Sequence, residues 1–239
     1  MRTGFLRKLK ANWLRIIVHV GAWLPLIWLV WLYFSDQLTV NPIQAATQRT
    51  GKIALILLVS SLACTPLNTI FGFRQALSVR RALGLYAYMY AVLHFLIFTG
   101  WDYAFNLSFI LLDVSNKAYI WVGLSVLLIL TSLAFTSTRG WMKRMGKNWK
   151  RLHRLVYLAG GLVILHYAWS KKGDLLSLQG EVLQPAIFGV VVALLLAARL
   201  PIVRRTASLV RTRWVARLFL SQADRSKQSS VAGTAPGQG

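Results

Sequence analysis

The sequence is poor in acidic residues and in cysteine. Only six of its 239 residues are Asp or Glu, against 28 Lys or Arg, and the formal net charge is +22. The single cysteine, Cys64, excludes an internal disulfide and every motif that needs two cysteines, including the CxxCH attachment site of c-type haem. The sequence also lacks the GxGxxG fingerprint and the P-loop, so no nucleotide-binding domain is recognisable in it. Any haem that it carries is therefore held without a covalent link.

Apolar residues, by contrast, are abundant. Of the whole sequence 56% is hydrophobic and only 14% is charged, which is not the composition of an ordinary soluble domain. Stretches of about 16 to 20 apolar residues can cross a hydrocarbon core about 30 Å thick. The six candidate stretches are Ile16–Phe34, Ile53–Phe71, Leu83–Trp101, Ala118–Thr136, Leu155–Ser170 and Val182–Leu200. We therefore expect an all-α protein, a bundle of six transmembrane helices.

The basic residues lie mostly on one side of this predicted bundle. They gather at the N-terminus, in the loops 72–82 and 137–154, and in the region from Arg199 onward, whereas the opposite loops carry all but one of the six acidic residues. The positive-inside rule makes the basic side cytoplasmic. We expect a multi-pass protein of a bacterial inner membrane with both termini in the cytoplasm. The high charge then indicates topology and attraction to anionic lipids rather than nucleic-acid binding.

The two ends of the chain differ from the bundle. The first apolar stretch is longer than the core of a cleaved signal peptide, so we expect a retained helix and one transmembrane domain over 1–203. Residues 204–220, RRTASLVRTRWVARLFL, alternate basic and apolar positions as a basic amphipathic helix on the membrane surface does. The polar segment 221–239 has the composition of a disordered tail.

Two histidines are predicted to lie at the same depth. His94 and His166 each follow a cytoplasmic arginine by 12 to 14 residues, which places both on the outer side of the bilayer. An imidazole in the membrane is costly unless it is paired, binds a metal or transfers protons. Two at one depth favour the axial ligands of one haem, although either could instead be a hydrogen-bonded core residue.

The cytoplasmic side offers two further candidates, His153 and Arg80. His153 lies 13 residues before His166, and on an ideal helix this leaves the two rotated by about 140°. A π-bulge or the pair Gly160-Gly161 could absorb part of that rotation. Arg80, 14 residues before His94, lies at the depth of His153 and could contact a haem propionate or stand where a second ligand would be. The alternatives are an interfacial histidine and an ordinary positive-inside arginine.

The stretches TPLNTIFGFRQALSVRRALGLYAYMYAVLHF and LAFTSTRGWMKRMGKNWKRLHRLVYLAGGLVILHYAW resemble the MsrQ (formerly YedZ) family of haem-binding membrane subunits, over about Trp13 to Arg205. That family belongs to the ferric-reductase-like transmembrane superfamily, in which paired histidines on the third and fifth helices bind two stacked b haems. In this sequence the fifth helix keeps both histidines, His153 and His166, but the third keeps only His94, with Arg80 at the inner position. The resemblance therefore implies one haem b, or two if His153 and Arg80 complete a second site.

The resemblance also implies a role and partners. Such subunits pass electrons across the inner membrane to a periplasmic molybdopterin-containing catalytic subunit, which reduces methionine sulfoxide in oxidised proteins. They are described as using FMN, with a cytoplasmic flavin reductase or the quinone pool as donor. We expect the chain to be an electron-transfer subunit rather than the catalytic one. The alternatives are a stand-alone quinone- or flavin-linked (ferric) reductase, a haem-free proton-coupled transporter, and a cofactor-free scaffold.

Overall fold

The computed structural model describes residues 2–171, 173–174, 179–180, 183–200 and 203. The predicted amphipathic helix 204–220 and tail 221–239 lie outside them. In chain order the elements are α1 (Arg2–Phe34), α2 (Pro42–Phe71), α3 (Gln75–Leu96), the π-helix η1 (Ile97–Asp102), α4 (Leu107–Asn116), α5 (Ala118–Phe135), α6 (Arg139–Met145), α7 (Lys147–Leu152), α8 (Leu155–Trp169), β1 (Gly173–Asp174), β2 (Gln179–Gly180) and α9 (Leu183–Ala197).

The fold is helical, as predicted, and each of the six apolar stretches overlaps a helix; Leu83–Trp101 runs over both α3 and η1. Four segments are long and apolar enough to cross a membrane, namely Asn12–Phe34, Pro42–Phe71, Gln75–Asp102 and Ala118–Phe135. Helices α8 and α9 have only 15 residues each. The count of six spans therefore remains a prediction. Several features were not predicted: the π-helix η1, the short helix α4, the helices α6 and α7 within the expected loop 137–154, and a two-residue antiparallel ladder between β1 and β2.

Helix α2 has clear sequence signals at both ends. The Asn41 side chain accepts a hydrogen bond from the Gln44 N–H at 3.1 Å, and Pro42 occupies the first turn, where its missing N–H costs nothing. At the other end Gly72 adopts φ 73°, a left-handed conformation that glycine accepts without strain, and its N–H closes the helix on the Asn68 carbonyl. The turn after Gly72 leads directly into α3.

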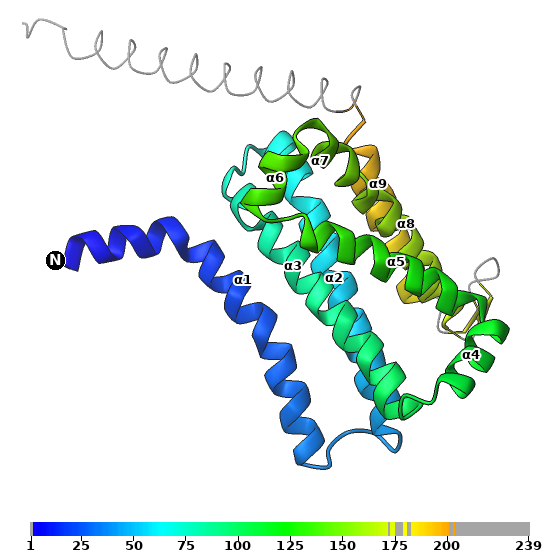
Figure 1. The fold of residues 1–239 in the computed structure, drawn as a ribbon. Helices are drawn as coiled ribbons and strands as arrows, with labels where there is room; N and C mark the ends of the chain where they lie inside the picture. Colours follow the sequence, from blue (N-terminus) through cyan, green and yellow to red (C-terminus); the bar gives the residue numbers. More distant parts are fainter. Residues whose placement is uncertain (1, 172, 175–178, 181–182, 201–202, 204–239) are drawn as a thin grey trace, which may run out of the picture.

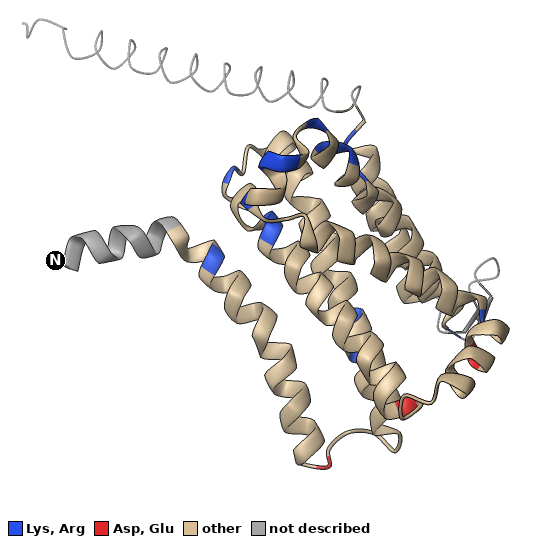
Figure 2. Cartoon of the chain, in the orientation of Figure 1, with Lys and Arg blue, Asp and Glu red and all other residues tan. Residues whose placement is uncertain are grey.

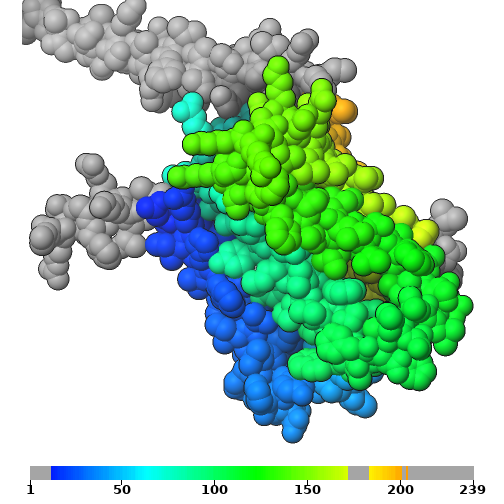
Figure 3. Space-filling view, viewed as in Figure 1, coloured from blue at the N-terminus to red at the C-terminus, as the bar shows by residue number. Residues whose placement is uncertain are grey.

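The helices form two antiparallel pairs that pack together. One pair is α2 with α3 and the other is α5 with α8; α3 also contacts α5, and α2 contacts α8 (Figure 1). Helix α1 lies along α3 on the flank of the bundle, as the space-filling view shows (Figure 3), and α9 packs on α8 and α2. The four helices of the two pairs enclose the centre of the molecule.

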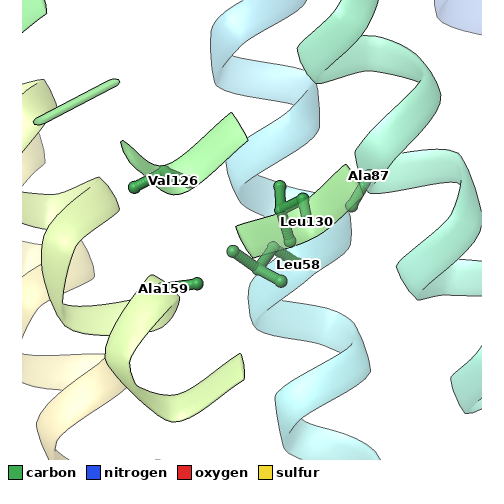
Figure 4. Close-up of a cluster of buried hydrophobic side chains, with 5 residues drawn as sticks. All are labelled: Leu58, Ala87, Val126, Leu130 and Ala159. Atoms are coloured by element: carbon green, nitrogen blue, oxygen red, sulfur yellow. The ribbon is translucent and has the colours of Figure 1, made fainter. Parts of the chain in front are cut away.

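Small side chains bring these four helices close together. The central buried cluster consists of Leu58, Ala87, Val126, Leu130 and Ala159, one or two from each helix (Figure 4). Ala87 and Ala159 are fully buried. A Cβ on Gly160, next to this cluster, would lie only 3.0 Å from Cδ1 of Leu62. Helix α8 therefore approaches α2 closely there. The centre of the bundle is thus filled by apolar side chains.

The charge asymmetry is visible in the fold. Lys and Arg gather at the end of the bundle that carries α6 and α7, whereas the described Asp residues lie at the opposite end (Figure 2). The end of α9 lies toward the basic end (Figure 1). This arrangement places the loops 72–82 and 137–154 on the same side, as the sequence predicted.

Candidate functional site

The structure brings His94 and His166 together at the end of the bundle remote from α6 and α7. His94 lies in the last turn of α3 and His166 in the last turn of α8, so one residue comes from each antiparallel pair. Their ring centroids are 6.2 Å apart and the ring planes are 88° apart. The two histidines, which the sequence predicts to lie at the same depth, are thus also side by side.

Each ring makes one hydrogen bond, and it fixes the position of the proton. Nδ1 of His94 lies 2.8 Å from the Thr47 carbonyl oxygen on α2, and Nδ1 of His166 lies 2.8 Å from the Tyr119 carbonyl oxygen on α5. A carbonyl can only accept, so Nδ1 of each neutral ring must carry the proton. Nε2 then keeps its lone pair, and in the described part of the chain it has no hydrogen-bond partner. Both rings are therefore ready to bind a metal through Nε2.

The spacing of the two rings fits two axial ligands of one iron. Imidazole nitrogens bind metals at about 2 Å, so two rings on opposite sides of one ion have centroids about 6 Å apart. Among the described residues no group of three or more His, Cys, Asp or Glu could hold a bare metal ion. Two imidazoles without further ligands suit an iron whose other ligands come from a macrocycle, as in haem.

His153 has a different environment. It is not part of α8, contrary to the prediction that one helix holds both His153 and His166, because α7 ends at Leu152 and the chain turns before Leu155. The 140° rotation calculated for one ideal helix therefore does not apply to this pair. The ring stacks on Trp149, with centroids 4.1 Å apart.

The position of the proton on the His153 ring is not fixed by a carbonyl, as it is in His94 and His166. Its Nε2 lies 3.1 Å from Oγ1 of Thr136, whose hydroxyl is also 2.7 Å from the Ser132 carbonyl. If that hydroxyl donates to Ser132, as the shorter distance favours, Nε2 of His153 is the donor to Oγ1. Burial, with a smaller effect of the Arg80 charge, lowers the pKa of His153, so the ring is neutral at pH 7.

Arg80 lies near the start of α3, and its charge acts on His153; that the two lie at one depth stays a prediction. Its backbone carbonyl accepts a hydrogen bond from Ser61 Oγ on α2 at 2.9 Å. Its guanidinium is half-buried and has no hydrogen-bond or ion-pair partner among the described residues. A half-buried arginine without an acidic partner is suited to bind an anionic group from outside the chain.

Sequence reasoning treated Arg199 only as one more basic residue. In the structure its guanidinium donates to the Leu62 carbonyl at 2.6 Å and to the Tyr157 hydroxyl at 2.7 Å, and it lies over the Tyr157 ring. An isolated arginine at the end of the last apolar stretch was the available signal. The carbonyl partners of His94 and His166 were also missed, because the type of a residue does not show which donor its backbone carbonyl will accept.

Comparison with known proteins identifies the family of the chain. Residues 50–164 match the family of ferric reductase like transmembrane components. The chain is 43% identical over 196 residues to the protein-methionine-sulfoxide reductase heme-binding subunit MsrQ of Rhodospirillum rubrum, covering 81% of this chain and 91% of the relative. The proteins of the same name from Herminiimonas arsenicoxydans and Deinococcus radiodurans are 38% and 46% identical, over 92% and 68% of this chain and 91% and 80% of their own length. The chain belongs to the MsrQ family of ferric-reductase-like membrane proteins.

Proposed function

We propose that this protein is a b-type haem electron-transfer subunit that serves a methionine sulfoxide reductase, with His94 and His166 as the axial ligands of its outer haem. The observation that carries the proposal is the pair of facing histidines whose Nδ1 protons are both committed to carbonyls. The relatives' own name, heme-binding subunit of such a reductase, supports it. We infer that the partner is a periplasmic molybdopterin-containing catalytic subunit.

The chain's own residues would hold and orient the group. The carbonyls of Thr47 and Tyr119 keep each ring in the tautomer that leaves Nε2 free, and hydrogen bonding at Nδ1 makes the imidazole a more basic ligand. The half-buried rings lie between apolar helices, where low polarity contributes to the redox potential. When bound there, haem iron supplies one-electron transfer.

A second haem would require an inner site at His153 and Arg80. Two facts bear on this proposal. The guanidinium of Arg80 has no described partner and could hold a propionate, whereas Nε2 of His153 is already in contact with Thr136. Ligation through Nε2 would therefore require the Thr136 hydroxyl to move. The inner site is therefore less ready to bind a haem iron than the outer one.

We propose that FMN binds next to the inner site, in a basic hollow at the α6–α7 end. The hollow has a volume of about 590 Å³ and is lined by Gly146, Lys147, Lys150, Arg151 and Arg154. Cationic side chains suit a flavin phosphate, and Arg154 directly follows His153. A cytoplasmic flavin reductase or the quinone pool would supply the electrons. The double variant K150E/R151E should lose bound FMN while keeping the outer haem, and unchanged FMN content per chain would contradict this placement.

The proposed topology is a six-span inner-membrane protein with both termini in the cytoplasm. The separation of basic and acidic residues between the two ends supports it (Figure 2). The outer end, where Trp101 is exposed and stacks with Tyr33, would then face the periplasmic partner. Electrons would leave from the haem site, which lies at this end.

The ligand assignment is tested by single substitutions in detergent-purified protein. His94→Ala and His166→Ala should each abolish the outer haem, measured as haem per chain and as the dithionite-reduced minus oxidised α-band. His19→Ala is the matched control, because this exposed intramembrane histidine bonds Tyr86 on the flank of the bundle. A wild-type spectrum in His94→Ala would show the assignment to be wrong.

Two outcomes would favour the alternative functions. Reduction of quinone or ferric chelates by the purified subunit alone, as fast as with its partner, would indicate a stand-alone reductase. Folded wild-type protein that contains no haem, although produced with haem available, would favour a proton-coupled transporter.

A further inference from the structure

The two histidines are held by the same local arrangement on both antiparallel pairs. His94 bonds the carbonyl of Thr47, and His166 bonds that of Tyr119, and both bonds join residues 47 positions apart. In both cases a glycine follows the carbonyl residue by four positions, Gly51 on α2 and Gly123 on α5. Carbonyl, glycine and histidine therefore recur in the same order and at the same spacing in the two halves of the bundle.

Helix geometry gives these glycines a specific role. The carbonyl of residue i accepts the N–H of residue i+4, and the Cβ of residue i+4 points back toward the helix N-terminus. A side chain at position i+4 therefore covers the carbonyl of residue i on the helix surface. With glycine there, the Thr47 and Tyr119 carbonyls are open to a neighbouring helix. The Thr50 hydroxyl also lies 3.0 Å from the Thr47 oxygen, but it is closer to the Ala46 oxygen, at 2.8 Å, and has one proton to donate.

The imidazoles occupy the space that these side chains would need. A Cβ on Gly51 would lie 3.0 Å from Nδ1 and 3.1 Å from Cε1 of His94. A Cβ on Gly123 would lie 2.7 Å from both Nδ1 and Cε1 of His166. The clashing atoms include the nitrogen that donates to the carbonyl, so a methyl group would push the ring away from that hydrogen bond.

We propose that Gly51 and Gly123 are positioning residues that admit the two axial histidines to their carbonyl acceptors and thereby set the tautomer and basicity of both haem ligands. This inference rests on the proposed ligation by His94 and His166. Glycine within a helix lowers the stability of that helix relative to alanine. The close contact with each imidazole explains why glycine is nevertheless present at both positions.

The proposal predicts a change in the haem itself. A weakened Nδ1–H···O=C bond makes imidazole less basic, and a less basic ligand stabilises ferric iron less, so the midpoint potential should rise. Loss of such a supporting bond lowers metal-site affinity by about 10- to 100-fold. The effect should be larger for Gly123→Ala than for Gly51→Ala, because the methyl group would lie closer to the ring.

The experiment compares Gly51→Ala and Gly123→Ala with Gly161→Ala, using the full chain in detergent. Gly161 lies on α8 with His166, and no atom lies within 4 Å of where its Cβ would be. Folding is checked by size-exclusion chromatography. Haem per chain, electron paramagnetic resonance g values and the midpoint potential are then measured. If Gly123→Ala fails to fold, Gly51→Ala, with its milder contact, carries the test.

We expect a raised potential, shifted g values and reduced haem affinity for the two test variants, and wild-type values for Gly161→Ala. Wild-type potential and g values in folded Gly51→Ala and Gly123→Ala would overturn the proposal. His94→Ala separates this result from a failure of the ligation itself. If that variant keeps the wild-type spectrum, the ligand assignment is wrong and the inference falls with it; if it loses the haem while the glycine variants are unchanged, only the inference is wrong.

Discussion

At the scale of single residues, the partner of each ring nitrogen distinguishes the histidines. Carbonyl acceptors at Nδ1 leave Nε2 of His94 and His166 free, whereas Nε2 of His153 contacts the Thr136 hydroxyl. Sequence spacing showed that all three could lie near a haem. It could not show which nitrogen each would offer, because this depends on atoms from other helices.

This difference leads to a prediction for His153. His153→Ala should leave the low-spin signal of the outer haem unchanged, because no described contact joins His153 to His94 or His166. The measurement is electron paramagnetic resonance of the oxidised protein, with haem per chain determined in parallel. Disappearance of the outer signal would contradict the separation of the two sites.

A second residue-scale prediction concerns Asp113 at the outer end. Hydrogen bonds from Lys117, and then from the Tyr103 hydroxyl, lower the pKa of the Asp113 carboxyl from its ordinary value of 3.8. A lowered folded-state pKa contributes stability that is present above pH 3.8 and is lost as the pH falls through the folded-state value. Thermal unfolding of wild-type and Asp113→Asn protein across pH should therefore differ most near neutrality and converge in acid. A constant difference at all pH values would contradict this explanation.

At the scale of elements, a proline in α2 explains the attachment of α9. Pro66 lacks the N–H that would bond the Leu62 carbonyl one turn earlier in the helix. Arg199, just after α9, donates to that carbonyl at 2.6 Å. The hydrogen bond missing within one helix is thus supplied by another, and the end of α9 is joined to the middle of the bundle.

The test is a double-mutant cycle. Arg199→Ala should lower stability by about 1 to 3 kcal/mol, the cost of leaving a buried acceptor unpaired. In a Pro66→Ala background the restored N–H can bond Leu62, so the same substitution should cost less. Thermal or denaturant unfolding in detergent measures both values. Equal costs in the two backgrounds would show that Arg199 acts through other contacts, such as the Tyr157 ring.

At the scale of the whole molecule, α8 and α9 are short for helices that cross a bilayer. At about 1.5 Å per residue, a helix of 15 residues is about 22 Å long, shorter than a hydrocarbon core of about 30 Å. Short spans are accommodated by local thinning of the bilayer and by flanking basic side chains that extend to the interface. Their packing against the long helix α2 supports the proposal that both cross.

Reporter fusions test the number of spans. With six spans and a cytoplasmic N-terminus, the C-terminus would also be cytoplasmic, so a green fluorescent protein placed after Gly239 should fluoresce and alkaline phosphatase at the same position should be inactive. Alkaline phosphatase inserted in the turn at Ala104, before α4, should be active. An active phosphatase at the C-terminus would mean an odd number of spans and would exclude the proposed topology.

Composition and periodicity alone determined the helical class, the positions of the apolar helices and the asymmetry of charge. These properties follow from the local chemistry of the chain, since a long apolar run must form a helix in lipid and basic loops remain on the cytoplasmic side. The depth of His94 and His166 was also available, because a helix has a fixed rise per residue.

Only the tertiary structure decided how these histidines are held. The carbonyl partners of His94 and His166 and the bond from Arg199 to Leu62 all depend on backbone atoms of distant segments. A glycine or proline four positions later marks a carbonyl that can be open, but the sequence does not show which of these carbonyls meets a donor from another helix. That selection is made when the helices pack, because packing alone brings a donor to the exposed oxygen.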